Sequence, residues 1–371
     1  MTVMEEYWIW LSSVEGIGAK RFYKLLSLYE DARNVWDALG GPLVPPDIPA
    51  AVGKAAFGKL RAARNEDYFL RLFDRLEEGG IRAVTRLSDD YPPALTGIYD
   101  PPPTLYVRGD GALSAERMIA VVGSRKCTRD GQRAAREFAM GLAQNGVTVV
   151  SGMARGVDSW AHRGALDGHG PTVAVLGCGV DVVYPPENGD LAAEILDSGG
   201  AIISEYVPGT PPVPGNFPAR NRIVSGLCEG TLIVEGAKAS GAMITVNLTL
   251  DQGREVFAVP GSIYSPLSAG PNQLILDGAV PVLSPWDILE HCRWARRPAG
   301  GAAKPAPKRD LGPEEEAIVA PLRNEALSFE DLAQITGLSA AKLNSHLTML
   351  ELRGIIDKAP GGLYRAYTQI G

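Results

Sequence analysis

Residues 119–126 have the sequence IAVVGSRK, and this short stretch decides the fold class. The apolar run Ile119–Val122 is rich in β-branched side chains and predicts a buried strand. Gly123 follows it directly and lets the backbone turn sharply. Three polar residues come next: Ser124, Arg125 and Lys126. Ligands of α/β proteins collect just beyond the strand ends, so this turn is the first candidate site, and an anion is its natural partner.

Five more runs of the same kind follow along the chain, separated by stretches with helical periodicity. They are Thr148–Val150, Thr172–Leu176, Ala201–Ser204, Thr231–Val234 and Glu255–Val259. Strands that alternate with helices form a parallel sheet covered on both faces. The fold class predicted for residues 96–295 is therefore α/β, with a doubly wound, mostly parallel sheet.

The two flanking zones differ from this middle zone. Residues 1–95 show the apolar spacing of helices, and residues 296–312 are rich in Ala, Pro, Gly and Lys, which is typical of a flexible linker. Residues 313–371 hold three predicted helices and a hairpin: Glu314–Leu322, Ser328–Thr336, Ser339–Leu352 and Ile355–Tyr367. We expect an N-terminal helical domain, a linker and a C-terminal winged-helix domain around the sheet.

The bulk composition limits the class of protein. A chain of 371 residues exceeds one ordinary domain, and 45% hydrophobic with 21% charged residues is a globular balance. No apolar run approaches a membrane span and no secretory signal is recognisable, so we expect a cytoplasmic protein with no membrane partner. The net charge of −7 argues against a uniformly basic protein that coats DNA, but a basic cleft can lie on an acidic body.

The second predicted strand ends in a glycine-flanked loop, residues 151–158, with the sequence SGMARGVD. Gly152, Arg155 and Gly156 place backbone amides and a cation before a helix, an arrangement that favours phosphate. A tight strand-to-helix connection capped by Asp158 is the alternative. The glycine spacing does not match the dinucleotide fingerprint, so nicotinamide chemistry is disfavoured.

Residues 216–222, NFPARNR, form the richest segment, and we expect a loop held between prolines. Phe217 can stack a base, while Arg220, Asn221 and Arg222 can hold the backbone. Stacking of a base on an aromatic ring is worth about 1–3 kcal/mol and tolerates any base. The alternative is that Phe217 anchors the loop and that the arginines pair with acids such as Glu205.

Lys238, Ser240 and Gly241 stand at a further helix start on the same sheet edge. Several anion sites along one edge suit a polyanion better than one small cofactor, so no cofactor is predicted. The spacing of Asp158 and His162 could place two metal ligands on one helix face, but no third ligand is evident. A hydrogen bond from His162 that orders the phosphate loop is the preferred interpretation, and no metal or catalytic residue is predicted.

Taken together, these segments resemble those of the DNA-processing protein A (DprA/Smf) family. Six separated motifs carry the resemblance, in the family's order: Gly123–Arg125, Ser151–Asp158, Ala161–His162, Phe217–Arg222, Ser240–Met243 and Val259–Gly261. They cover the whole middle zone, whereas the flanking zones match only in type.

The resemblance implies an extended Rossmann-like domain that dimerises, binds single-stranded DNA cooperatively and loads the recombinase RecA during natural transformation. Single-strand-binding protein is a further candidate partner, and no catalytic step is implied. The family's pattern points to Arg125, Phe217, Arg220 and Lys238 as DNA contacts.

The two ends add weaker candidates for duplex or partner contacts. Gly16, Gly18 and Lys20 lie in a turn that looks like a helix-hairpin-helix or SAM-like element, and a pure packing role is an equal alternative. The winged-helix zone offers Lys342, Arg353 and Arg365.

Two other functions remain open from the sequence. Related Rossmann-like enzymes cleave the base from nucleoside monophosphates, but their Pro-Gly-Gly loop is absent here, where residues 235–241 have the sequence EGAKASG. A winged-helix transcription regulator with a ligand-sensing middle domain is the other alternative, and it would prefer a defined duplex sequence.

Overall fold

The computed structural model describes residues 2–109, 111, 113, 115–295, 311–323, 325–352, 355–359 and 363–366. The chain divides into two compact units, residues 1–296 and residues 297–371, and each is described by itself. Among the described residues, no helix is both long and apolar enough to cross a membrane.

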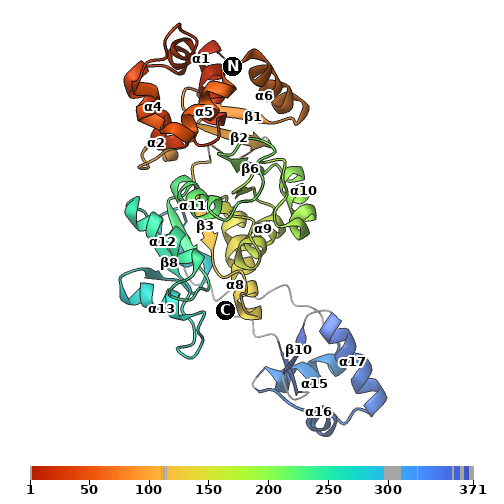
Figure 1. Ribbon diagram of the computed structural model, residues 1–371. Helices are drawn as coiled ribbons and strands as arrows, with labels where there is room; N and C mark the ends of the chain where they lie inside the picture. The colour runs from red at the N-terminus through yellow and green to blue at the C-terminus, as the bar shows by residue number, and fades with distance from the viewer. Residues whose placement is uncertain are drawn as a thin grey trace. The chain divides into compact units, whose positions relative to one another are not determined.

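A sheet with the strand order β1-β2-β6-β5-β4-β3-β7-β8-β9 forms the centre of the first unit (Figure 1). All six predicted strands are present: β3 (Met118–Val122), β4 (Thr148–Ser151), β5 (Thr172–Val175), β6 (Ala201–Ser204), β7 (Gly230–Ile233) and β8 (Glu255–Ala258). Each of these strands is parallel to its neighbours among the six. The predicted α/β class with a mostly parallel sheet is confirmed.

Three strands were not predicted from the sequence: β1 (Arg82–Thr85), β2 (Thr104–Arg108) and β9 (Val280–Pro281). β1 pairs antiparallel with β2, and β2 pairs antiparallel with β6. β1 lies inside the stretch expected to be helical, which is a correction. Only Val84 and Thr85 of this strand are buried, so its apolar pattern is too short to indicate a strand.

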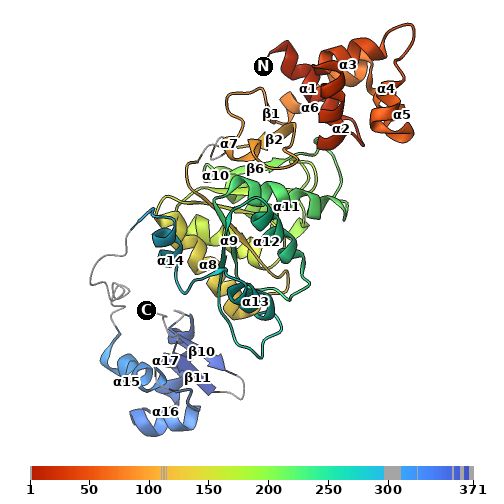
Figure 2. The same cartoon turned by 90° about the vertical axis from the view of Figure 1, so that its left-hand side faces the viewer.

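Helices cover both faces of the sheet (Figure 2). One face packs against α11 (Asn216–Leu227), α12 (Gly241–Asp251) and α13 (Ala269–Leu276), and the other packs against α8 (Arg129–Gln144), α9 (Val157–Asp167), α10 (Gly189–Asp197) and α14 (Pro285–His291). Successive residues of β3 alternate between the two cores: Ala120 and Val122 face α11, and Ile119 and Val121 face α8.

The order of the strands places the candidate site. From β3 the chain winds through β4, β5 and β6 to one side and then returns to β7 and β8 on the other side. The winding direction therefore reverses between β3 and β7. In doubly wound sheets ligands bind at this reversal, outside the carboxyl ends of the strands.

The N-terminal helices form their own core within the first unit. They are α1 (Val3–Ser13), α2 (Ala19–Tyr29), α3 (Ala32–Leu39), α4 (Asp47–Val52), α5 (Lys54–Ala63) and α6 (Glu66–Glu78), and a short α7 (Pro93–Thr96) and the 3-10 turn Pro186–Asn188 complete the unit. Trp10 and Phe22 are fully buried, and the Trp10 indole donates to the Ala63 carbonyl (2.9 Å). Ile9 and Leu72 pack against Tyr106 of β2 and join the helices to the sheet.

The second unit contains α15 (Pro313–Leu322), α16 (Phe329–Thr336) and α17 (Ala340–Leu352), followed by the antiparallel pair β10 (Ile356–Ala359) and β11 (Leu363–Ala366). Ser328 caps α16 by accepting from the Asp331 amide (3.1 Å). Leu332, Leu343 and Ile356 lie in one apolar core. Three helices and a hairpin confirm the predicted winged helix. The predicted linker lies almost entirely outside the described residues.

Candidate nucleic-acid interface

The loop after β3 is fixed from two sides at the reversal of the sheet. The Ser124 amide donates to the Glu235 carbonyl after β7 (2.7 Å), and the Ser124 carbonyl accepts from the Val157 amide at the start of α9 (3.2 Å). A side chain at Gly123 would lie 2.6 Å from Val157, so only glycine fits. The loop therefore holds the exposed Arg125 and Lys126 at the carboxyl end of β3.

The loop after β4 packs directly on the first loop. Gly156 has a φ of +76°, and a Cβ there would lie 2.2 Å from the Ser124 carbonyl oxygen. The Asp158 carboxylate accepts from the Gly152 amide (3.2 Å) and the Ala154 amide (3.3 Å). Burial raises the pKa of Asp158, against the effect of the nearby Arg220 charge. Asp158 therefore does not cap α9, whose N-cap is Gly156, and instead closes the loop that precedes the helix.

Arg125 and Phe217 come together at this edge. The Arg125 guanidinium lies 5.7 Å from the centre of the Phe217 ring, which is a cation–π distance. The same ring lies 5.4 Å from the ring of Tyr184 and is half-buried. Phe217 thus anchors its segment against Tyr184 and also supports the guanidinium. Within the described residues, the structure gives Arg125 no carboxylate partner.

The segment 216–222 is not the predicted loop, because it forms the first two turns of α11. Proline at 218 is tolerated in a first helical turn, where its missing amide has no partner to lose. Asn221 is half-buried on this helix.

Arg220 and Arg222 point into the protein, and their expected placement at the surface is wrong. Arg220 is 3% exposed and donates to the Gly152 carbonyl (3.0 Å) and to the Val175 carbonyl. Burial lowers the pKa of its guanidinium, and the charge of Asp158 opposes this effect. Arg220 therefore connects the ends of β4 and β5 to α11 and supports the carboxyl edge of the sheet from inside the protein.

Arg222 forms the ion pairs that the alternative interpretation named. It is 7% exposed and makes two 2.6 Å hydrogen bonds to the Glu205 carboxylate. Its Nε lies 3.2 Å from an Asp100 carboxylate oxygen. The charge of Arg222 is therefore neutralised by carboxylates inside the protein and is not presented at the surface.

Glu235 is a site residue that the sequence did not reveal. Its carboxylate accepts from the Thr128 amide (2.8 Å) and the Thr128 hydroxyl (2.5 Å), and Thr128 in turn caps α8 through the Gly131 amide (3.0 Å). A Cβ on Gly131 would lie 2.4 Å from the same carboxylate. The start of α8, where a Rossmann fold places a phosphate, is therefore filled by the protein's own acid.

The remaining predicted residues of the sheet edge are spread more widely. Arg155 is exposed and pairs with Glu187 through both carboxylate oxygens. Lys238 donates to Gln273 of α13 (3.0 Å). Ser240 precedes α12, with its hydroxyl buried and unpartnered among the described residues, and Gly241 is exposed.

His162 does not order the phosphate loop as expected. It is fully buried, and its Nδ1 lies 2.7 Å from the Thr172 hydroxyl of β5. Burial lowers its pKa to about 3, with a further contribution from the Arg220 charge. The ring is therefore neutral and joins α9 to the sheet. Among the described residues, no group of three potential ligands is arranged for a metal.

The candidate contact residues near the two ends of the chain belong to the N-terminal helices and to the winged helix. Gly16 has a φ of +92°, Gly18 precedes α2, and the Lys20 ammonium lies 5.4 Å from the Tyr99 ring centre. In the winged helix, Lys342 pairs with Glu314 (2.9 Å) and Arg365 pairs with Asp357 (3.5 Å). Arg353 lies outside the described residues.

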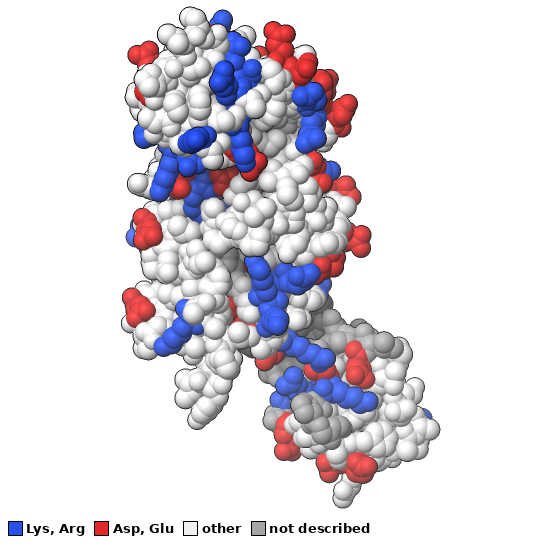
Figure 3. Space-filling model, in the orientation of Figure 1, with Lys and Arg blue, Asp and Glu red and all other residues white. Residues whose placement is uncertain are grey.

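Basic side chains gather in two regions on one face of residues 1–295. Figure 3 shows Lys and Arg around α2 and α5 and again over α8. The α8 group consists of Arg129, Arg133 and Arg136. It lies on the helix that starts just after the Arg125 loop, but Arg133 pairs with Glu137 (2.7 Å) and Arg136 pairs with Asp167 (2.5 Å), so acids match two of its three charges.

Comparison with known proteins agrees with this arrangement. A family model for DNA recombination-mediator protein A matches residues 82–293. The chain belongs to the DNA processing protein A (DprA) family. A second model, the DprA winged helix domain, matches residues 302–362. The DprA resemblance noted in the sequence is therefore confirmed across the sheet and the C-terminal unit.

The chain is similar to several named DprA proteins. Protein Smf of Escherichia coli is 38% identical over 294 residues, which cover 78% of this chain and 79% of that protein. DNA processing protein DprA of Streptococcus pneumoniae is 43% identical over 237 residues, which cover 62% and 83% of the two chains.

Two solved DprA structures are also similar to this one. The S. pneumoniae DprA structure has a TM-score of 0.64 at 34% identity and covers 78% of this chain and 98% of that chain. A Helicobacter pylori DprA structure, whose description concerns a single-stranded DNA binding mode, has a TM-score of 0.52 at 29% identity and covers 57% and 95%.

Proposed function

We propose that this DprA protein binds single-stranded DNA along the carboxyl edge of its sheet, protects incoming DNA in natural transformation and delivers it to RecA. The observation that carries the proposal is the Arg125 guanidinium held over Phe217. It is a cation without a carboxylate partner in the described part of the chain, fixed in direction by an aromatic ring. Such a group can bind a phosphate or stack against a base, and neither contact requires a particular sequence.

The proposed contact residues are those that the structure leaves exposed at this edge. Lys126 adjoins Arg125 on the same turn. Arg155 is paired with Glu187, but both side chains are at least half exposed, so a phosphate can displace the carboxylate at small cost. Lys238 and Gly241 extend the edge towards α12. Arg220 and Arg222 are assigned the role of positioning this surface.

The same geometry counts against a nucleotide-processing enzyme. A nucleotide bound in the usual Rossmann manner would place its phosphate at the start of α8, and the Glu235 carboxylate lies there, bonded to Thr128. A second anion at that point would meet charge repulsion. We therefore propose a binding protein without a catalytic step or a cofactor, acting in the cytoplasm.

A homodimer is proposed as the form that binds. Near the outer strand β9, Leu276 at the end of α13 is 81% exposed, and Leu283 just after the strand is 72% exposed. Exposed apolar side chains beside an outer strand favour a protein contact. A dimer would present two copies of the DNA-binding surface, and together they would hold one DNA strand more tightly than a single copy. RecA and single-strand-binding protein are proposed as the protein partners.

The first test compares Arg125→Ala with the wild-type chain on oligothymidine across a range of salt concentrations. Loss of one phosphate contact on a single strand should lower the magnitude of the slope of log affinity against log salt by about 0.7. Fluorescence anisotropy measures both affinity and slope. Arg117→Ala, a charge removal at the opposite end of β3, is the matched control.

A comparison of two DNA probes distinguishes this function from transcriptional regulation. Oligothymidine should bind more tightly than a mixed-sequence duplex of equal length. Tighter binding to one defined duplex, or an Arg125→Ala slope equal to that of the control, would remove the sheet edge as the single-strand site.

A further inference from the structure

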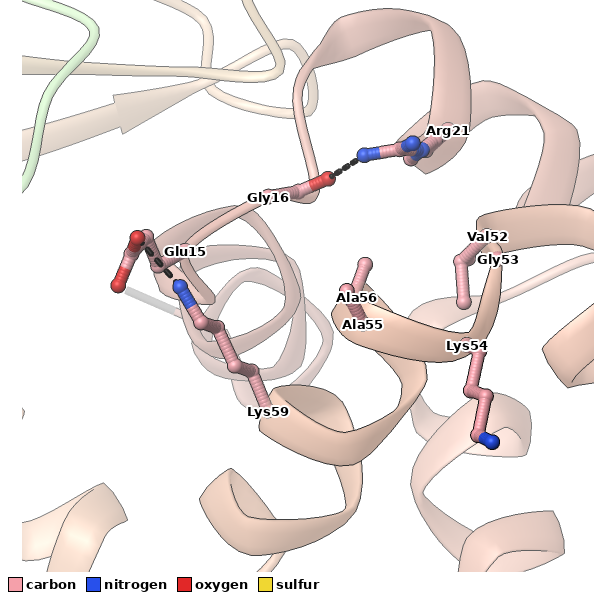
Figure 4. A pocket seen from close by; sticks show the side chains of 9 residues that line it. All are labelled: Glu15, Gly16, Arg21, Val52, Gly53, Lys54, Ala55, Ala56 and Lys59. Carbon is pink, nitrogen blue, oxygen red and sulfur yellow. Dashed lines mark hydrogen bonds and ion pairs between the residues drawn. The ribbon is translucent and has the colours of Figure 1, made fainter.

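Two pockets lie beside the N-terminal helices of the first unit. The smaller, of about 350 Å³, lies between the turn before α2 and the start of α5 (Figure 4). Lys59 forms an ion pair with Glu15 there, and Arg21 donates to the Gly16 carbonyl (2.7 Å), so internal contacts engage three of its four charged side chains. The larger pocket has a volume of about 640 Å³, within the range of ligand sites, about 300–1,000 Å³.

The larger pocket, the β1 groove, lies between α6 and β1 at one end of the sheet (Figure 1). Its apolar wall consists of Phe73 and Leu76 of α6 and Ile81 just before β1. Its rim carries four acids and one arginine: Glu5, Glu77, Arg82, Asp89 and Asp90. These groups leave an excess of three negative charges. The β1 groove therefore suits a cationic partner and would repel the phosphates of DNA.

Two of the four acids are free to bind such a partner. Asp90 forms an ion pair with Arg82 (2.8 Å), and the Glu5 carboxylate accepts from the Ser88 hydroxyl (2.6 Å). Glu77 on α6 and Asp89 in the turn after β1 are exposed. Within the described residues, no lysine, arginine or histidine forms an ion pair with either of them.

β1 is the outermost strand of the sheet, and part of its outer backbone edge is open. The Arg86 amide donates to the Pro103 carbonyl (3.1 Å), so every second residue counted back from Arg86 faces β2 and the residues between them face outwards. Of the outward residues, Thr85 is closed by Ser88, which contacts its amide (3.0 Å) and its carbonyl (2.9 Å). The outward amide and carbonyl of Ala83, which lines the groove, have no partner among the described residues. An open position on an edge strand can pair with another chain.

We propose that the β1 groove binds an extended segment of a protein partner in which an apolar residue lies between lysines or arginines. The apolar residue pairs with the backbone of Ala83 as an added strand does. Paired residues on neighbouring strands share a face, and Ala83 packs in the same core as Phe73, so the apolar side chain lies against the wall of the groove. The flanking cations lie beside Glu77 and Asp89.

Charge decides between this occupant and the others that an open edge could take. A second copy of this chain would bring two acidic rims together, and like charges across an interface are unfavourable. DNA is disfavoured for the same reason. The inference is independent of the single-strand function, because none of the groove residues belongs to the carboxyl edge of the sheet.

The test uses the full-length chain and a fluorescent heptapeptide of alternating lysine and valine. Fluorescence anisotropy should show binding of this peptide and no binding of a glutamate–valine peptide of equal length. The double variant Glu77→Lys, Asp89→Lys should weaken binding about tenfold, because two attractive charges become repulsive. The matched control Asp251→Lys, Glu290→Lys changes the net charge equally at exposed acids outside the groove. It should alter the affinity by less than about twofold, because distant surface charges are screened.

A second peptide tests the backbone pairing without changing the protein. Methyl groups on the three valine amides remove the donor to the Ala83 carbonyl and should weaken binding about fivefold. Equal affinity of the two peptides would overturn the strand pairing, and equal affinity of the charge-reversed variant and its control would overturn the groove. If the charge reversal instead changes oligothymidine affinity or the sedimentation coefficient more than the control does, the groove binds DNA or a second copy, and the proposal fails. The Arg125→Ala result on oligothymidine does not depend on any of these outcomes.

Discussion

The ion pair between Arg222 and Glu205 provides a quantitative test of the corrected role of Arg222. The Arg222 side chain is 8% exposed and the Glu205 side chain is 14% exposed, and the pair joins α11 to the end of β6. Glu205→Ala would leave the buried guanidinium with only the Asp100 carboxylate, at 3.2 Å, and backbone carbonyls. The charge would lose its bidentate partner without gaining water.

Removal of one partner from a buried ion pair costs about 3–5 kcal/mol. The remaining Asp100 contact argues for the low end, so we expect about 3 kcal/mol. For a unit of this size each kcal/mol lowers the melting temperature by about 2 °C, which predicts a decrease of about 6 °C. The double variant Arg222→Met, Glu205→Met should recover most of the loss, because apolar replacement of a buried pair is often neutral.

The melting temperatures of the wild type, Glu205→Ala and the double variant are measured by circular dichroism. Their affinities for oligothymidine are measured in parallel. The double variant should keep the wild-type salt slope, since Arg222 is assigned no phosphate contact. A Glu205→Ala melting temperature within 1–2 °C of the wild type, an effect of about 1 kcal/mol or less, would refute the energetic argument. A reduced salt slope in the double variant would return Arg222 to the DNA surface.

Two further predictions concern the buried supports of the edge. Since the pKa of His162 is about 3 in the folded chain and about 6.5 when unfolded, the unfolded chain binds more protons between these values. His162 should therefore lower stability by about 1.4 kcal/mol per pH unit as the pH falls below about 6.5, and urea unfolding of His162→Gln should lack this part of the slope. Gly156→Ala should cost about 2 kcal/mol or more and weaken DNA binding, because its Cβ would meet the Ser124 carbonyl at a φ of +76°. Gly58→Ala, in open space on α5, should be neutral or stabilising in the same assays.

The sequence was sufficient for the parallel sheet and the winged helix. Runs such as Ile119–Val122 are buried on both faces and so are continuously apolar, which makes them recognisable without tertiary information. β1 was missed because an antiparallel edge strand depends on its partner more than on its own pattern, whereas β2 carries a buried apolar run, Leu105–Val107, so its signal was present in the sequence. Arg82, at the exposed end of β1, gives no signal of a strand.

The direction of side chains could not be predicted in the same way. Arg220 and Arg222 are two residues apart on α11, and both are buried because the helix packs against the strand ends and the loop at Asp100. Only the tertiary arrangement brings Glu205 and the Val175 carbonyl to them. Glu235 was missed for the same reason, since its partner Thr128 is 107 residues away in sequence. A glutamate directly after a buried strand was the one signal present.

These internal contacts limit how the edge can bind DNA. Of six basic residues predicted there, Arg220 and Arg222 hold the fold, and Arg155 must exchange Glu187 for a phosphate. The four remaining cations, Arg125, Lys126, Arg155 and Lys238, would together account for a salt slope of only about 3 on a single strand. Tight binding therefore has to come from several surfaces engaging one strand. A second copy of this edge in a dimer and the basic side chains around α2 and α5 are the surfaces that the structure offers for this purpose.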